Sequence, residues 1–247
     1  MGIQIIYQSD YKKFHKNPIQ KNVWDAIAKS WKTYVITKIP VVERFIKNKR
    51  GFIIDFGCGG GRNMLPHKDC MYYGIDFSKK QITQAKKYIK EHNLRAKKNI
   101  KENSIRAKIY KSRLDKLNKR KFKDNMFDHG LYIATLHCVE SEKEREKSLD
   151  ELYRVLKPGA QALITVWNSQ DKRFGQVNNQ GPVYLSWKEN KTGKENKNIH
   201  MRFYYLYKKQ ELIDLIKKAG FKIIKFYPTK NQKDRFSRKN WIVKVKK

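Results

Sequence analysis

Short apolar runs alternate with helical patterns over most of the chain. The runs that predict buried strands cover 52–56, 71–76, 107–111, 127–134 and 160–167. Strands that alternate with helices are typical of an α/β fold, in which helices cover a mostly parallel sheet. Two further alternating segments, at 221–226 and 241–245, predict an antiparallel pair of strands at the end of the chain.

Apolar residues that recur every three or four positions predict the helices. They indicate one or two helices within 21–47, a short one at 63–66, and longer ones over 79–92, 141–156 and 208–220. Ser78 can cap one of these helices, and Ser141 with Glu144 forms a capping box for another. The helices before the first strand either close over a ligand or simply pack on the sheet.

We expect a single domain over 1–247, because neither a second domain nor an internal repeat is visible. Residues 1–50 form its helical prefix. The segment 168–201 is polar and lacks periodicity, which predicts a loop insertion. Loops of this length inside a compact domain are usually functional or disordered, so we expect this one to contact the substrate.

A glycine-rich turn follows the first predicted strand. Its four glycines, within 57–61, allow positive φ angles and a close approach of the backbone to a ligand. Asp55 at the turn would attract a cationic ligand and repel a diphosphate. The dinucleotide fingerprint G-x-G-x-x-G fails, because its third glycine position is Arg62. The alternative is a surface turn that binds nothing.

Asp76 ends the second predicted strand, about 20 residues after the glycine turn, where nucleotide-binding folds place a carboxylate for a ribose diol. The alternative is an exposed loop aspartate. Thr135, Leu136 and His137 follow the strand at 127–134. Open α/β sheets bind ligands at these carboxyl ends of strands, so this edge is the expected site.

The charge of the chain favours a polyanionic partner. Of 247 residues, 57 are Lys or Arg and 23 are Asp or Glu, which gives a net charge of +34. Nucleic acid is the partner that this charge indicates, although a Lys-rich genome bias explains part of it. The most basic stretch, 93–123, is either a solvated edge or a surface that faces phosphates.

The three cysteines, Cys58, Cys70 and Cys138, form no C-x-x-C pair. Neither a disulfide framework nor a metal site follows, and a reducing, cytoplasmic setting is expected. The N-terminus lacks the basic and apolar regions of a signal peptide. No apolar run approaches 18 residues, so we expect no membrane span.

The ordered motifs resemble those of class I S-adenosylmethionine-dependent methyltransferases. They are D-x-G-x-G-x-G over 55–61, the acid at Asp76, Phe127-Asp128, and the string 151–159 that ends in Leu-Lys-Pro-Gly. The resemblance implies a Rossmann-like fold with a seven-stranded sheet, S-adenosylmethionine as cofactor, and Asp55 facing its aminopropyl ammonium group. The cofactor-binding residues that it implies are Asp55, Gly57, Gly59, Gly61, Arg62, Asp76, Phe77, Ser112, Arg113 and Ala134.

A narrower set of motifs resembles the wobble-uridine tRNA methyltransferases. The matching segments are 27–28, 40–43, 136–138, 166–167, 183–187, 202–207 and 240–241. This resemblance implies esterification of carboxymethyluridine in the tRNA anticodon and a small zinc-binding activator subunit as partner. The chain departs from the family pattern at 35–40, which lacks an R-x-K-P-W-like segment, at Ser112 in place of an acid, and at Tyr205 in place of histidine. These departures leave the exact nucleotide open.

A carboxylate acceptor is ionised at neutral pH, since its unperturbed pKa is about 4, and needs no general base. Catalysis would then come mostly from orientation. We expect His137, Trp167 and Asn168 to act at the reacting centre, with a packed histidine and a core tryptophan as the alternatives. The residues expected to bind substrate are Lys38, Trp187, Arg202, Tyr204, Lys208, Lys209 and Asn240.

Two other functions stay open at this point. One is a methyltransferase of a small molecule or protein. The other is a non-catalytic RNA-binding protein that retains the methyltransferase fold, against which the intact glycine turn argues.

Overall fold

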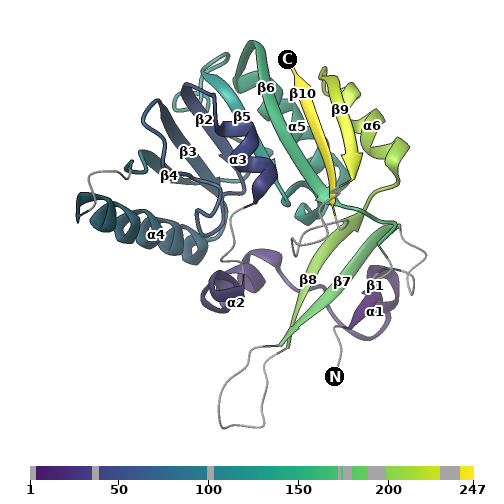
Figure 1. Cartoon of the computed structure of the whole chain (residues 1–247). Coiled ribbons are helices and arrows are strands. Elements are labelled where there is room, and N and C mark those ends of the chain that lie inside the picture. The colour runs from purple at the N-terminus through teal and green to yellow at the C-terminus, as the bar shows by residue number, and fades with distance from the viewer. Residues whose placement is uncertain are drawn as a thin grey trace.

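A seven-stranded sheet forms the centre of the computed structural model, which describes residues 4–34, 39–98, 103–171, 174, 180–188, 199–228 and 240–247 (Figure 1). The strand order is β4-β3-β2-β5-β6-β10-β9. Only β10 runs antiparallel to its two neighbours, β6 and β9. The predicted α/β fold with a mostly parallel sheet is therefore confirmed. The strands are β2 (Gly51–Phe56), β3 (Cys70–Asp76), β4 (Ala107–Lys111), β5 (Phe127–Ile133), β6 (Leu156–Trp167), β9 (Lys222–Pro228) and β10 (Asn240–Lys246).

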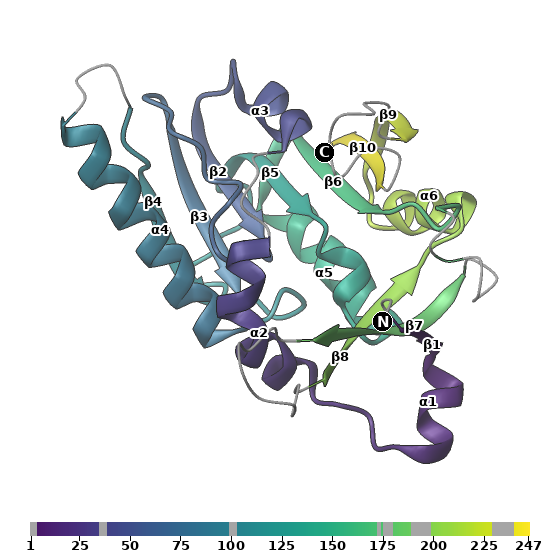
Figure 2. The ribbon, with the colours of Figure 1, turned by 60° about the horizontal axis from the view of Figure 1, so that its bottom comes forward.

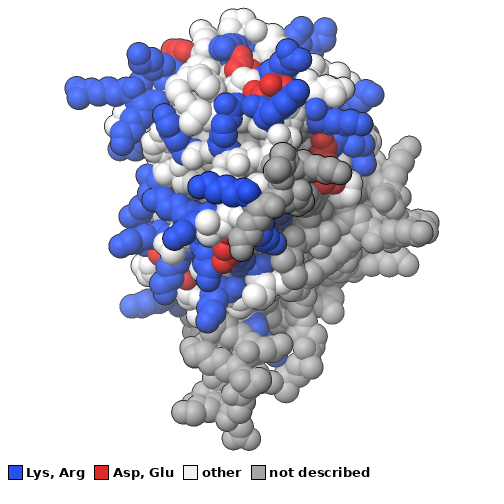
Figure 3. All heavy atoms as spheres, turned by 60° about the vertical axis from the view of Figure 1, so that its left-hand side comes forward, with Lys and Arg blue, Asp and Glu red and all other residues white. Residues whose placement is uncertain are grey.

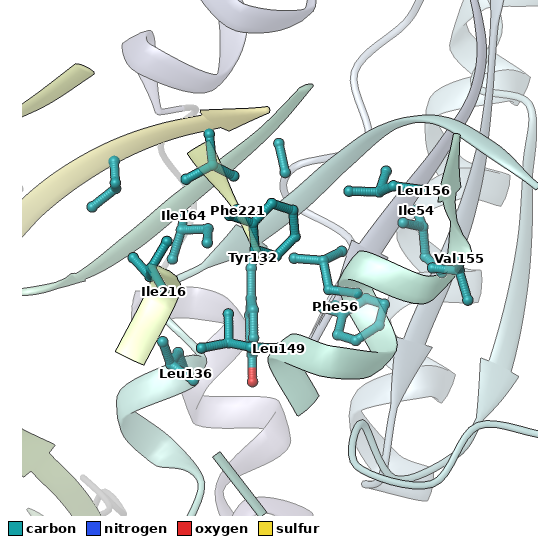
Figure 4. Close-up of a cluster of buried hydrophobic side chains, with 14 of the residues drawn as sticks. Ile54, Phe56, Tyr132, Leu136, Leu149, Val155, Leu156, Ile164, Ile216 and Phe221 are labelled. Carbon is teal, nitrogen blue, oxygen red and sulfur yellow. The ribbon is translucent and has the colours of Figure 1, made fainter. Parts of the chain in front are cut away.

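Helices cover both faces of this sheet because the central strands are apolar on both sides. On one face, Ile54 and Phe56 of β2 pack with residues from α5 (Glu142–Val155) and α6 (Lys209–Lys218), as Figure 4 shows. On the other, Ile53 packs with α3 (Pro40–Ile46) and α4 (Lys79–Lys98). Alternate side chains of one strand thus enter two cores, as the period of two requires.

The helix boundaries follow the predicted caps with two differences, and one further helix, α1 (Gln8–Phe14), was not predicted. Ser141 caps α5, since its Oγ accepts a hydrogen bond from the Glu144 backbone N–H at 3.2 Å. Helix α4 continues to Lys98, beyond the predicted end at 92. The predicted helix at 63–66 is wrong, because this segment is a turn closed by the Met64 N–H bond to the Gly61 carbonyl at 3.0 Å.

A smaller three-stranded sheet, of order β1-β7-β8, lies beside the carboxyl edge of the large one. Its strands are β1 (Ile5–Tyr7), β7 (Gly181–Lys188) and β8 (Ile199–Leu206). The predicted loop over 168–201 is therefore wrong for 181–188 and 199–201. The period of two is missing because both faces are buried: α2 (Gln20–Tyr34) packs on one, and α1 (Gln8–Phe14) lies against the other.

Helix α2 lies between α4 and β8 (Figure 2). Asp25 accepts hydrogen bonds from Ser78 Oγ at 2.6 Å and from the Lys80 backbone N–H at 3.0 Å, so it adds a second cap to α4. At the other end of α2, the Gln20 amide bonds the backbone of Met201 and Phe203 in β8. The predicted helical prefix is thus fixed across the edge of the sheet where ligands are expected.

Replacing Leu152 tests the packing of α5 on the sheet. Leu152 is fully buried, so Leu152→Ala is expected to lower the free energy of unfolding by about 2–5 kcal/mol in urea denaturation. The matched control is Leu94→Ala on α4, where the side chain is 52% exposed and the loss should stay within about 0.5 kcal/mol. Equal losses at the two positions would contradict the buried interface between α5 and the sheet.

Candidate cofactor and active site

A cavity of about 230 Å³ opens at the carboxyl ends of β2, β3 and β5. The glycine turn, the end of β3, the segment after β4 and the segment after β5 form its walls, and α2 closes one side with Trp24 and Trp31. Seven of the expected cofactor residues line it: Gly57, Gly59, Arg62, Asp76, Phe77, Arg113 and Ala134. Asp55, Gly61 and Ser112 are not among its lining residues.

The glycine turn has the close approach that its sequence predicts. Gly57 has a φ of 72°, and a Cβ atom there would lie 2.1 Å from Cγ2 of Thr135. The Gly57 and Cys58 N–H groups donate to the Ile75 carbonyl at 2.8 and 2.9 Å. Only glycine fits this position, because the turn presses directly against the segment that follows β5.

Asp76 faces the cavity from the end of β3. Its Oδ2 accepts from the Gly59 N–H and its Oδ1 from the Ser78 N–H, both at 2.9 Å. Burial raises the pKa of this carboxyl to about 6, although the backbone hydrogen bonds oppose the rise. Each oxygen retains a second lone pair, so the carboxylate is oriented to accept hydrogen bonds from a diol.

Asp55 lies one layer behind the cavity. Its carboxyl is fully buried, and neither oxygen has a hydrogen-bond partner within the described residues. Burial raises its pKa to about 7, the Asp76 charge adds to the rise, and the nearby Asn63 and Arg62 oppose it. Asn63 and Arg62 line the cavity, whereas Asp55 does not.

Acids gather at the cavity of this otherwise basic protein. Asp115, Glu140 and Glu144 line it together with Asp76, and Arg113 forms ion pairs with both Asp115 and Glu144. The sequence prediction missed Asp115, which stands three residues beyond Ser112. Trp24 and Trp31 on α2 were also missed as site residues, although their seven-residue spacing places them on one helix face.

The three residues expected at the reacting centre lie together just outside the cavity lining. The Trp167 backbone N–H donates to His137 Nδ1 at 3.2 Å, and the two rings stack at 5.1 Å. Trp167 also stacks on Tyr204 at 4.0 Å. Asn168 is buried next to Trp167. Cys138, the neighbour of His137, lines the cavity, so this cluster forms the layer behind that wall.

Arg202 on β8 is buried in an aromatic enclosure formed by Trp31, Trp187 and Tyr204. Its Cζ lies 5.2, 4.9 and 5.3 Å from the three ring centroids. The guanidinium donates to Tyr204 Oη at 2.8 Å and to the Ser186 carbonyl at 3.4 Å. Within the described ranges, its Nε–H has no acceptor and no carboxylate pairs with it. Arg202 therefore brings a buried positive charge for which the described part of the chain supplies no counterion.

This charge lies next to the cavity. Trp31 belongs both to the enclosure and to the cavity wall. Cys138 also lines the cavity, and although burial raises the pKa of its thiol, the Arg202 charge opposes that rise. Helix α2 and the segment after β5 together form this wall of the cavity, and Arg202 places a positive charge behind it.

The remaining expected substrate residues are dispersed. Trp187 donates its Nε1–H to Ser30 Oγ on α2 at 3.0 Å. Lys208 and Lys209 are exposed at the start of α6, and Asn240 is buried opposite Trp167 in the sheet. None of these four residues lines the cavity. Lys38 lies outside the described residues. Within the described part of the chain, no three His, Cys, Asp or Glu side chains group as metal ligands.

The cavity fits S-adenosylmethionine. Phe77, Leu114 and Ile133 offer apolar surface for a base, and Asp76 is set to accept from a ribose diol. The surrounding acids suit a ligand whose sulfonium and ammonium groups are cationic.

The family model for the methyltransferase domain matches residues 54–164. A tRNA (carboxymethyluridine(34)-5-O)-methyltransferase of Schizosaccharomyces pombe is 27% identical over 252 residues, which cover 94% of this chain and 98% of the relative. The enzyme with the same description in Arabidopsis thaliana is 27% identical over 69% of this chain, and the match spans only 38% of that relative. Phosphoethanolamine N-methyltransferase 2 of Caenorhabditis elegans is 26% identical over 80% of this chain and 38% of the relative.

The fold is also that of a solved structure. An S-adenosylmethionine-dependent methyltransferase from Clostridium acetobutylicum superposes with a TM-score of 0.62, at 12% identity and over 96% of both chains. Residues 54–164 are thus a methyltransferase domain, and the sheet order and the cavity of the chain are those of class I S-adenosylmethionine-dependent methyltransferases.

Proposed function

We propose that this enzyme methylates the carboxylate of carboxymethyluridine at the wobble position of tRNA. The observation that carries the proposal is the buried Arg202 guanidinium beside the cofactor cavity, which pairs with no carboxylate of the described residues. Burying an unpaired charge is costly, so such a group is retained where a ligand compensates it. A guanidinium attracts a carboxylate, and this favours an acidic acceptor on the cavity side of the wall.

The reaction requires little from the protein beyond the correct orientation of the methyl donor and the acceptor. S-adenosylmethionine supplies a methyl group that its sulfonium already activates. An acceptor carboxylate at this wall is stabilised in its ionised form by the positive charge of Arg202 behind it, and it needs no base to remove a proton. The rings of Trp31, Trp187 and Tyr204 exclude water around that pair. Catalysis then rests on the approach of one carboxylate oxygen to the methyl carbon.

Two further observations support tRNA as the carrier of this carboxylate. The relative from Schizosaccharomyces pombe, which matches over nearly its full length, is described by this activity. The net charge of +34 suits a polyanionic substrate. The proposal includes a small zinc-binding activator subunit as partner, which the family resemblance implies, and the assays below are run with and without it.

Transfer to tRNA tests the proposed function directly. Labelled S-adenosylmethionine and tRNA that carries carboxymethyluridine are expected to give the methyl ester at the wobble base, identified by mass spectrometry of nucleosides. Matched tRNA with the uncharged carbamoylmethyl group should accept no methyl, because it lacks the carboxylate. Phosphoethanolamine serves as a second acceptor. Methylation of it alone would replace the proposal with a small-molecule function.

Arg202→Met separates a substrate-binding arginine from a structural one. The substitution keeps an unbranched side chain but removes the positive charge, so transfer to tRNA should fall by roughly a hundredfold, or about 2.7 kcal/mol, while binding of S-adenosylmethionine stays unchanged. The melting temperature should fall only slightly, because the removal of a buried charge offsets the loss of the hydrogen bonds to Tyr204 and Ser186. A fall in melting temperature with transfer retained would assign Arg202 a structural role.

The pH dependence of cofactor binding should follow Asp76. With a pKa of about 6, its carboxyl is ionised above that pH and protonated below it. A cationic ligand that needs the ionised form should therefore bind roughly tenfold more weakly at about pH 5 than at about pH 8. Calorimetry across this range measures the effect, and Asp76→Asn should bind more weakly with a smaller pH dependence. An unchanged pH profile in Asp76→Asn would show that another group, such as Asp55, sets it.

A further inference from the structure

The outer face of α4 carries a row of exposed lysines. Lys79, Lys86, Lys90 and Lys97, defined here as the lysine row, recur at intervals of seven, four and seven residues, which places them on one side of the helix. At 1.5 Å per residue the row spans about 27 Å. Figure 3 shows basic side chains gathered over this side of the molecule.

Carboxylates do not neutralise this row within the described residues. Its four members appear in none of the ion pairs of those residues, and the acid on the solvent side of α4, Glu91, lies against Lys87 and Lys32. Lys86 and Lys90 are four residues apart, where like charges destabilise a helix. The row therefore raises the free energy of the isolated protein, and a bound polyanion would lower it.

The two sides of α4 face different charges. The inner side of α4 contributes Gln81 and Tyr88 to the cofactor cavity, where Asp115, Glu140 and Glu144 repel phosphate groups. A nucleic acid whose base enters that cavity must hold its phosphates elsewhere. The lysine row begins at Lys79, three residues after Asp76, so it runs outward from the mouth of the cavity.

We infer that the lysine row is the docking surface for the sugar–phosphate backbone of the RNA substrate. The inference rests on the proposed function for the identity of the RNA, and it adds the surface that binds it. Phosphate contacts of this kind position a nucleic acid and make its binding dependent on salt.

A four-fold substitution of the lysine row by glutamine tests the inference, because glutamine removes the charge and has nearly the same helix propensity as lysine. Filter binding of tRNA, measured over a range of KCl concentrations, should show a dissociation constant raised at least about tenfold. The plot of the logarithm of the association constant against the logarithm of the KCl concentration has a negative slope, and the magnitude of this slope should decrease by about three. KM for tRNA should rise while kcat and cofactor binding stay unchanged.

The matched control removes the same charge from the opposite edge of the sheet. It replaces four exposed lysines of α6, β9 and β10 by glutamine: Lys217, Lys222, Lys225 and Lys246. Equal losses in the two variants would overturn the inference in favour of a diffuse effect of net charge. Loss of binding to phosphatidylserine vesicles, with tRNA binding retained, would assign the row to membranes. If the protein binds tRNA through the lysine row but transfers no methyl group to it, this inference holds and the proposed function is refuted.

Discussion

One buried carboxylate connects the three segments on which the active site depends. Asp76 accepts hydrogen bonds from the glycine turn at Gly59 and from the start of α4 at Ser78. Ser78 in turn donates to Asp25 on α2, and Asp25 also caps α4 at Lys80. The geometry of the turn, the direction of α4 and the position of α2 are therefore coupled. Both the Arg202 enclosure, through Trp31, and the lysine row are attached to this network.

The distribution of charge gives the cavity and the surface different ligands. Acids that face the cavity suit a cationic cofactor, whereas Arg202, one layer behind its wall, carries a positive charge that suits the anionic acceptor that we propose. Exposed lysines outside the cavity attract phosphate. Salt screens interactions between exposed charges over about 10 Å. The exposed lysines therefore have little effect on the charges inside the cavity. A protein of net charge +34 can thereby hold both a cation and a polyanion.

The sequence was sufficient to predict the parts whose signal is local. The strand at 107–111 and the Ser141 cap were predicted at the residues where they occur. The prediction failed where burial removes a pattern: β7 is covered on both faces, so its residues do not alternate. Helix α1 was missed because it has no buried residues and hence no apolar stripe.

The site was predictable to a similar degree. Most of the expected cofactor residues line the cavity, because a glycine turn and the ends of parallel strands define their own neighbours. Asp55 is in the right region, but its depth behind Asn63 depends on tertiary packing. The isolation of Arg202 could not be predicted, since the absence of a partner among the described residues is a property of the folded chain.

The hydrogen bonds of Gln20 to β8 have a consequence for the order of folding. They join residues that are 181 and 183 positions apart, so the enclosure forms only when most of the chain is available. Contacts of such high sequence separation are the slow ones in folding, because closing long loops costs entropy first. The parallel half of the sheet with its glycine turn, within 51–133, has much shorter connections. The glycine turn and the ends of β2, β3 and β5 can therefore assemble early, whereas the wall that α2 adds to the cavity is fixed to β8 only when residues near 201 have been made.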